Sequence, residues 1–177
     1  MRLTSATSAL VVIDLQERLL PAIPDGSTVI TESCRLVDAA RLFNVPILAT
    51  EQYPKGLGPT VETLAEKIDN LTEKLSFSCC GCESFTRQLG DATEAVVLCG
   101  LETHVCVAQT AIDLLAEGIG VWVAVDAVAS RRQLDHEVAL RRLESAGAVL
   151  TTTEAILFEW CRSADHPAFR EMRKLLQ

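Results

Sequence analysis

Short aliphatic runs alternate with segments of helical periodicity along the chain. Continuous apolar runs of this length are typical of parallel strands that are covered on both faces. A weaker candidate strand lies at 70–74 (NLTEK). The stronger candidate strands are 9–13 (ALVVI), 45–50 (VPILAT), 95–99 (AVVLC), 121–125 (VWVAV) and 148–151 (AVLT).

Between these runs, apolar residues recur with the period of an amphipathic helix. Gly118 and Gly147 each stand just before a strand, where a glycine in the left-handed conformation commonly ends a helix. The apolar stripes are Val29, Leu36, Ala40 and Phe43; Val107, Ala111 and Leu114 beside Ala108, Ile112 and Leu115; and Ala139, Leu140, Leu143 and Ala146.

The repeated strand–helix–strand order predicts an α/β fold: a three-layer αβα arrangement with a mainly parallel sheet of about six strands. A length of 177 residues fits one domain, so we expect 1–177 to form a single domain. In such folds the ligand crevice lies outside the carboxyl ends of the strands. The polar residues that directly follow each aliphatic run are therefore the ones to examine.

Composition and net charge disfavour several classes of function. Hydrophobic residues make up 49% and aromatic residues 5%, so the core must be aliphatic. The formal net charge of -8 disfavours a nucleic-acid partner, and the pairs 131–132 and 141–142 (both Arg-Arg) fit a solvated helix face. The run 9–13 is too short to cross a membrane and no cleavable signal is present, so we expect a cytoplasmic protein without a membrane partner.

The chain has seven cysteines, an odd number, and several lie inside apolar runs. This pattern argues against a secreted disulfide framework. The cluster SCCGCES (78–84) contains a Cys79-x-x-Cys82 spacing, which leaves incidental small residues, redox sensitivity and metal binding open. No second C-x-x-C or histidine pair completes a zinc site, so we expect neither a metal nor a cofactor.

Several polar or reactive residues follow the candidate strands directly. We expect these strand-end residues to meet along one edge of the sheet, because the carboxyl ends of parallel strands lie together. They are Asp14 after 9–13, Glu51 and Gln52 after 45–50, Lys74 at the end of 70–74, residues 100–106 after 95–99, and Asp126 after 121–125.

Asp14, Lys74 and Cys106 form a chemically sensible set. The thiolate is the nucleophilic form of cysteine, and a helix N-terminus or a nearby ammonium group favours it. Asp14 could hold Lys74 charged, take the thiol proton and pass it to a leaving group, while the first turn of the helix offers N–H donors to an oxyanion. Composition and spacing alone leave the plainer readings open: a buried structural thiol, a capping aspartate and a solvated lysine.

The chain resembles the isochorismatase-like cysteine hydrolase superfamily over most of its length. The matching segments occur in the family's order, and TEQYPKGLGPT (50–60) is most similar to the small isochorismatase-domain-containing proteins. This resemblance implies the Rossmann-like, isochorismatase-like hydrolase fold. The other segments are ALVVIDLQ (9–16), EKLSFSC (73–79), VVLCGLETHVCVAQTAIDLLAEG (96–118) and VAVDAVASR (123–131).

The resemblance also implies roles for individual residues. It makes Asp14 the acid/base, Lys74 its charge partner and Cys106 the nucleophile, with the backbone N–H groups of Glu102 and Cys106 facing the oxyanion. It implies a cis peptide bond between Leu101 and Glu102. The substrate-binding residues expected beside these are Gln52, Tyr53, Leu101 and His104, of which His104 could equally be structural or interfacial, and Gln52 and Tyr53 could be plain loop residues.

Two departures from the family pattern bear on the substrate. Metal-dependent nicotinamidases of this superfamily carry an Asp-x-His pair after the second strand, where this chain reads TEQYPKG. True isochorismatases lack the nucleophilic cysteine. We therefore predict a metal-independent cysteine hydrolase that cleaves an amide, carbamoyl or related C–N bond of a small molecule through a thioester, and forms homo-oligomers. The alternatives are an oligomeric partner-binding module with a vestigial site, or a thiol-based redox sensor.

Overall fold

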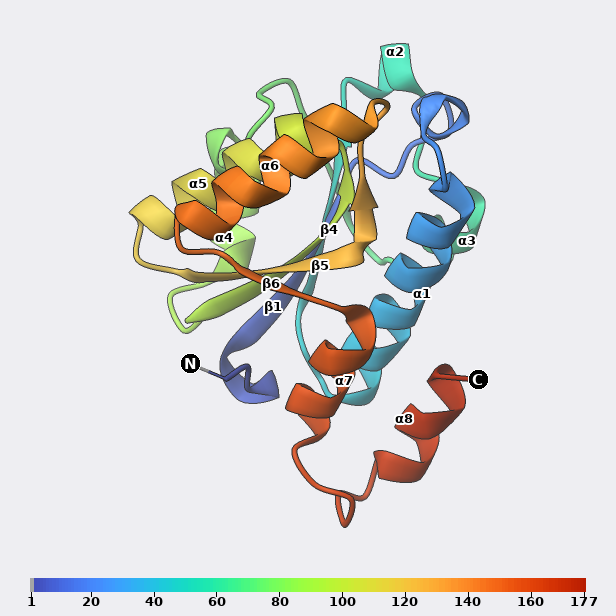
Figure 1. Cartoon of the computed structure of the whole chain (residues 1–177), viewed down its shortest axis with the longest axis vertical. Coiled ribbons are helices and arrows are strands. Elements are labelled where there is room, and N and C mark those ends of the chain that lie inside the picture. The colour runs from blue at the N-terminus through green and yellow to red at the C-terminus, as the bar shows by residue number, and fades with distance from the viewer. Residues whose placement is uncertain (1) are drawn as a thin grey trace.

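A computed structural model describes residues 2–177, in which one six-stranded sheet lies between two layers of helices (Figure 1). All neighbouring strands pair in parallel, in the order β3-β2-β1-β4-β5-β6. The predicted α/β class with a parallel, six-stranded sheet is confirmed. The strands are β1 (Ser8–Ile13), β2 (Ile47–Gln52), β3 (Leu71–Lys74), β4 (Ala95–Leu101), β5 (Gly120–Ala129) and β6 (Val149–Thr151).

The helices divide between the two faces of the sheet. In Figure 1, α4, α5 and α6 cover one face, α1 and α7 cover the other, and α8 packs against α1 and α7. Within residues 2–177, no helix has the length and apolar composition needed to cross a membrane. The helices are α1 (Gly26–Leu42), α2 (Pro54–Leu57), α3 (Glu62–Ala65), α4 (Glu83–Leu89), α5 (Ala108–Ala116), α6 (Gln133–Ser145), α7 (Thr153–Cys161) and α8 (Phe169–Leu175).

Successive side chains of a buried strand point to opposite faces of the sheet, and they form two hydrophobic cores. In β1, Val11 and Ile13 join the cluster under α4, α5 and α6, whereas Leu10 and Val12 join the cluster under α1 and α7. Burial of a strand on both faces explains why its sequence is continuously apolar. The expected positive φ angles are present at Gly118 and Gly147, where φ is 81° and 104°.

The strands extend beyond the apolar runs that predict them. β2 begins at Ile47 and continues to Gln52, because its last two residues pair with β3. β5 continues to Ala129, and its register against β4 jumps from Leu98–Val123 to Gly100–Val128. A bulge of this kind inserts unpaired residues and redirects their side chains.

The bulge in β5 changes the position of Asp126. Its carboxylate accepts hydrogen bonds from the backbone N of Thr153 at 2.9 Å and from the Thr153 hydroxyl at 3.1 Å. Thr153 is the first residue of α7, so Asp126 holds the start of that helix on the other face of the sheet. The prediction that Asp126 meets the other strand-end residues at the candidate site is therefore wrong.

The strand order reverses direction between β1 and β4, the two central strands. At such a switch point the connections leave toward opposite faces, which opens a crevice at the carboxyl ends of the strands. Asp14 directly follows β1 and Glu102 directly follows β4. Gly100 pairs with Ile13 at φ +119°, and a Cβ atom there would collide with the Ile13 backbone, so only glycine allows this close approach.

Candidate active site

Asp14 lies at the switch point with its side chain fully buried. Its backbone is left-handed, with φ of 51°, and its N–H donates to the Thr50 carbonyl at 3.1 Å. One carboxylate oxygen accepts from Lys74 Nζ at 2.7 Å and the other from Thr50 Oγ1 at 2.8 Å. A buried carboxylate needs partners of this kind to balance its loss of hydration.

Lys74 is the last residue of β3, and its side chain is also fully buried. Its ammonium donates to Asp14 and, at 2.7 Å, to Gln52 Oε1. It also donates to the carbonyls of Ser76 at 3.3 Å and Phe77 at 3.1 Å. The alternative that Lys74 is a solvated surface residue is therefore wrong, because β3 pairs with β2 and places the amine beside Asp14.

Cys106 lies in a single π-helical turn, Thr103–Val107, that leads into α5. Such turns frequently occur at functional sites. The residue is 6% exposed, and its Sγ lies 4.0 Å from Gln52 Oε1. Because the same Gln52 oxygen accepts from Lys74, the structure brings the thiol, the amide and the Asp14–Lys74 ion pair into one buried cluster.

The electrostatics of the cluster differ from the sequence-based expectation. Burial raises the pKa of the Cys106 thiol well above its ordinary value of 9.0, and the neighbouring Asp14 carboxylate raises that pKa further. The Lys74 ammonium lowers it, but by less. Lys74 favours the thiolate, as expected, but burial and the Asp14 carboxylate outweigh it, so the pKa of the Cys106 thiol lies above its ordinary value instead of below it.

Gln16 and Thr50, for which the strand-end pattern predicts no role, complete this arrangement. The Gln16 side chain accepts from the Gln52 N–H at 2.8 Å and donates to the carbonyls of Gln52 at 3.1 Å and Gly58 at 2.7 Å. Gln52 is thereby fixed at the backbone, and its Nε2 donates to the Leu75 carbonyl at 2.9 Å. The sequence feature that could have identified Gln16 is its position, because it follows the end of β1 by only three residues.

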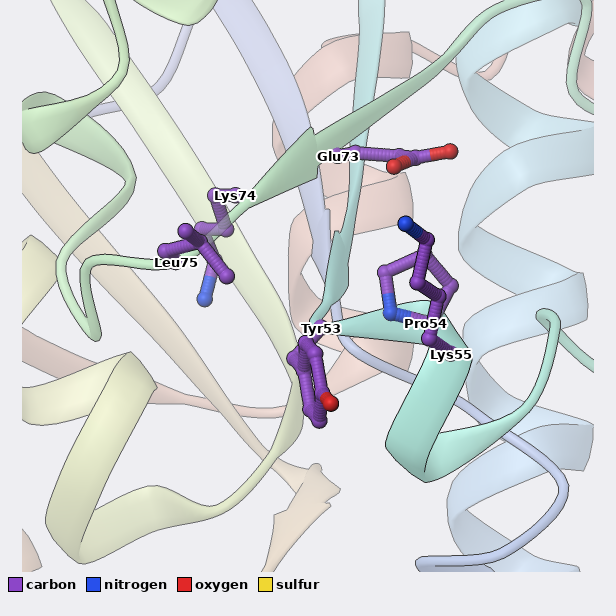
Figure 2. A pocket seen from close by; sticks show the side chains of 6 residues that line it. All are labelled: Tyr53, Pro54, Lys55, Glu73, Lys74 and Leu75. Atoms are coloured by element: carbon purple, nitrogen blue, oxygen red, sulfur yellow. The ribbon is translucent and has the colours of Figure 1, made fainter.

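A hollow of about 350 Å³ lies at the ends of β2 and β3 and shares Lys74 with the cluster, whereas Asp14, Gln52 and Cys106 are not among its lining residues (Figure 2). In Figure 2, the Lys74 side chain turns away from Glu73, and the ring of Tyr53 stands below the two strands. Tyr53 is 51% exposed and has a left-handed backbone with φ of 39°. Tyr53 and Lys74 thus line the hollow, whose walls are Tyr53, Pro54, Lys55, Glu73, Lys74 and Leu75.

The structure does not bring Leu101 and His104 to this hollow. Leu101 is fully buried in the core that lies under α1 and α7. His104 Nδ1 lies 2.9 Å from Ser130 Oγ, and the residue lines a separate hollow of about 220 Å³ beside α6. The peptide bond between Leu101 and Glu102 is cis.

Glu51 also lies outside the cluster, because its carboxylate accepts from the Thr60 N–H at 2.6 Å and so holds the following loop. Among the clustered cysteines, Cys79 is fully buried, and its Sγ lies 3.7 Å from Thr50 Oγ1. Burial raises the pKa of Cys79 to about 11. All seven cysteines are free, and within residues 2–177 no group of three or more His, Cys, Asp or Glu side chains is arranged to hold a metal ion.

Comparison with known proteins agrees with this architecture. The sequence model of the Isochorismatase domain matches residues 8–155. Isochorismatase domain-containing protein 2 of Danio rerio is 42% identical over 177 residues, which cover 99% of this chain and 89% of that protein.

Two solved structures are similar over nearly the whole chain. The MAR1 ribonuclease of Caenorhabditis elegans superposes with a TM-score of 0.95 at 44% identity, covering 99% of this chain and 92% of that one. YcaC from Pseudomonas aeruginosa, solved with hexane-2,5-diol and covalent acrylamide, has a TM-score of 0.90 at 26% identity, with 98% and 91% covered. The match to the domain model and the full-length relatives together show that the chain belongs to the Isochorismatase domain family.

Proposed function

We propose that the chain is a cysteine hydrolase that cleaves an amide, carbamoyl or related C–N bond of a small molecule through a thioester on Cys106. The family and its fold are those of hydrolases. One observation carries the finer proposal: a buried carboxylate, Asp14, is paired with Lys74 at 2.7 Å and lies in the same cluster as the Cys106 thiol. A nucleophile beside an oriented base is the general arrangement of covalent catalysis.

In the first step, Sγ of Cys106 attacks the carbonyl carbon while Asp14 takes the thiol proton. The S–C bond forms, and the carbonyl electron pair moves to oxygen, where the backbone N–H groups of Glu102 and Cys106 would stabilise the charge. The raised pKa of the thiol makes Asp14 necessary, because the free thiolate is scarce at neutral pH. Lys74 balances the buried carboxylate charge before the proton moves.

The tetrahedral adduct then collapses and the C–N bond breaks. Asp14 returns its proton to the departing amine, which leaves the acyl group on Cys106 as a thioester. A water molecule, deprotonated by Asp14, attacks the thioester carbonyl, the C–S bond breaks and the acid is released. The thiol regains its proton and the cycle closes.

The hollow next to the cluster supports a small-molecule substrate. Its volume of about 350 Å³ is at the lower end of the range for small-ligand sites. RNA is the competing substrate class, because a similar solved structure is described as a ribonuclease. The net charge of -8 disfavours RNA, since RNA is a polyanion. Leu75 lines the hollow and Phe77 follows it by two residues. Their side chains are 76% and 52% exposed, and we expect exposed apolar side chains of this kind to favour self-association.

Acrylamide tests the assignment of the nucleophile, because YcaC carries it covalently in its solved structure. We expect acrylamide to modify Cys106 at neutral pH. We expect the Asp14→Asn variant to react at least about tenfold more slowly, because the base is lost while burial of the thiol still keeps the thiolate scarce. Peptide mass spectrometry after timed exposure measures both rates.

Cys82 provides the matched control within the same chain. The hydrogen bond between Cys82 and Ser84 lowers the pKa of the Cys82 thiol, which is partly exposed, so acrylamide should label Cys82 at a rate independent of Asp14. Modification of Cys82 without modification of Cys106 would contradict the proposed nucleophile. Equal slowing of both cysteines in Asp14→Asn would show a general structural effect instead.

A further inference from the structure

Three consecutive residues ahead of Cys106 are each held by a residue of the segment that joins β5 to α6 or of the first turn of α6. These contacts anchor one side of the π-helical turn that presents the thiol. The pairs are Glu102 with Arg131 (Oε1 to Nε, 2.9 Å), Thr103 with His136 (Oγ1 to Nδ1, 2.9 Å) and His104 with Ser130 (Nδ1 to Oγ, 2.9 Å).

The first pair differs from the other two because it neutralises a buried charge. The Glu102 side chain is only 7% exposed, whereas that of Arg131 is 58% exposed. Arg131 donates to Glu102 Oε2 from both its backbone N and its Nε, each at 3.2 Å. His104 Nδ1 lies farther away, 3.8 Å from the same oxygen. Arg131 is therefore the principal partner of this carboxylate, and a buried carboxylate that loses its cation is costly.

The Glu102 carboxylate belongs to the residue whose N–H group faces the oxyanion in the proposed mechanism. A carboxylate and an oxyanion within one residue's length repel each other strongly in a poorly hydrated site. We propose that Arg131 is a positioning residue for the reaction: it neutralises Glu102 and fixes the turn, so that the Glu102 N–H can receive developing negative charge. This inference rests on the proposed function.

Two electrophiles separate this role from simple support of the fold. When the Cys106 thiol adds to acrylamide, an S–C bond forms at the terminal carbon and the double-bond electron pair shifts toward the amide oxygen. The thiol proton passes to Asp14 and then to the carbon next to the carbonyl. Iodoacetamide reacts by displacement, in which the S–C bond forms, iodide leaves and little charge reaches the amide oxygen. Only acrylamide therefore places a developing oxyanion in the site.

We expect Arg131→Met to slow acrylamide modification of Cys106 about tenfold and iodoacetamide modification by no more than about twofold. Arg131→Lys keeps the positive charge and should recover most of the acrylamide rate. In Glu102→Gln/Arg131→Met the uncompensated carboxylate is gone, so its acrylamide rate should also exceed that of Arg131→Met. Arg132→Met is the matched control, because the neighbouring Arg132 side chain is 72% exposed and its ion pair, at 3.6 Å, is with Asp135 and not with Glu102.

Peptide mass spectrometry of Cys106 supplies all these rates, and each outcome decides the inference. If Arg131→Met slowed modification by acrylamide and by iodoacetamide equally, or slowed neither reaction, the proposed role of Arg131 would be overturned. The same holds if Arg132→Met reproduces the effect. Wild-type protein that acrylamide does not modify at Cys106 would instead refute the proposed function, and the inference would fall with it.

Discussion

Replacement of Lys74 by Met is expected to lower the free energy of unfolding by about 3–5 kcal/mol, because it leaves the Asp14 carboxylate buried without its cation. Both side chains are fully buried, and their 2.7 Å contact is one of four hydrogen bonds made by the Lys74 ammonium. Methionine occupies a similar volume, so loss of charge and hydrogen bonding dominates the change. Urea unfolding of the two proteins at neutral pH measures the difference.

Lys67 provides the matched control for this experiment. Its ammonium contacts Asp38 at 2.6 Å, but the two side chains are 35% and 34% exposed. Lys67→Met should therefore cost less than about 1 kcal/mol. If Lys74→Met lowered the free energy of unfolding as little as Lys67→Met, the claim that a buried ion pair organises the site would be contradicted.

Replacement of Cys106 by Ser is expected to lower kcat/KM for a hydrolysed amide by at least about a thousandfold. A serine hydroxyl is a much weaker nucleophile than a thiol and would need a stronger base than the Asp14 carboxylate. The fold should persist, because the side chain changes by one atom. Release of ammonia or amine from a panel of small amides and carbamoyl compounds measures turnover.

Cys161→Ser is the control, since Cys161 is equally buried but lies in α7 on the other face of the sheet. Its turnover should stay within about twofold of the wild type. Turnover that survives in Cys106→Ser would refute the thioester mechanism. Cleavage of RNA with no turnover of any amide would favour the competing substrate class, and modification of Cys106 by oxidants with neither activity would favour the redox sensor.

The sequence predicted the sheet and much of the site because both depend on strand ends. Continuous apolar runs identified the buried strands, and the rule that ligands lie beyond their carboxyl ends selected Asp14, Gln52 and Cys106 for examination. Lys74 was harder to place, because β3 is a short edge strand whose alternating, partly polar sequence reads weakly. Only its pairing with β2 shows that its amine is buried.

The remaining features depend on tertiary contacts that no local pattern contains. The bulge that keeps Asp126 out of the site is a shift in the pairing of β5 with β4. The raised pKa of Cys106 depends on how completely neighbouring elements exclude water from the thiol. The hydrogen bonds between Gln16 and Gln52 join the loop after β1 to the end of β2, 36 residues away in sequence.

The ionisation of Cys106 tests the central claim most directly, which is that Asp14, Lys74 and this thiol act as one coupled unit. The difference in ultraviolet absorbance between each protein and its Cys106→Ser counterpart, followed against pH, reports the thiolate alone. In the wild type we expect no thiolate midpoint at or below the ordinary value of 9.0, because burial and then Asp14 raise this pKa. Asp14→Asn removes the carboxylate and leaves Lys74, so the midpoint should move to lower pH. A wild-type midpoint below 9.0, or the same midpoint in both proteins, would contradict the coupling.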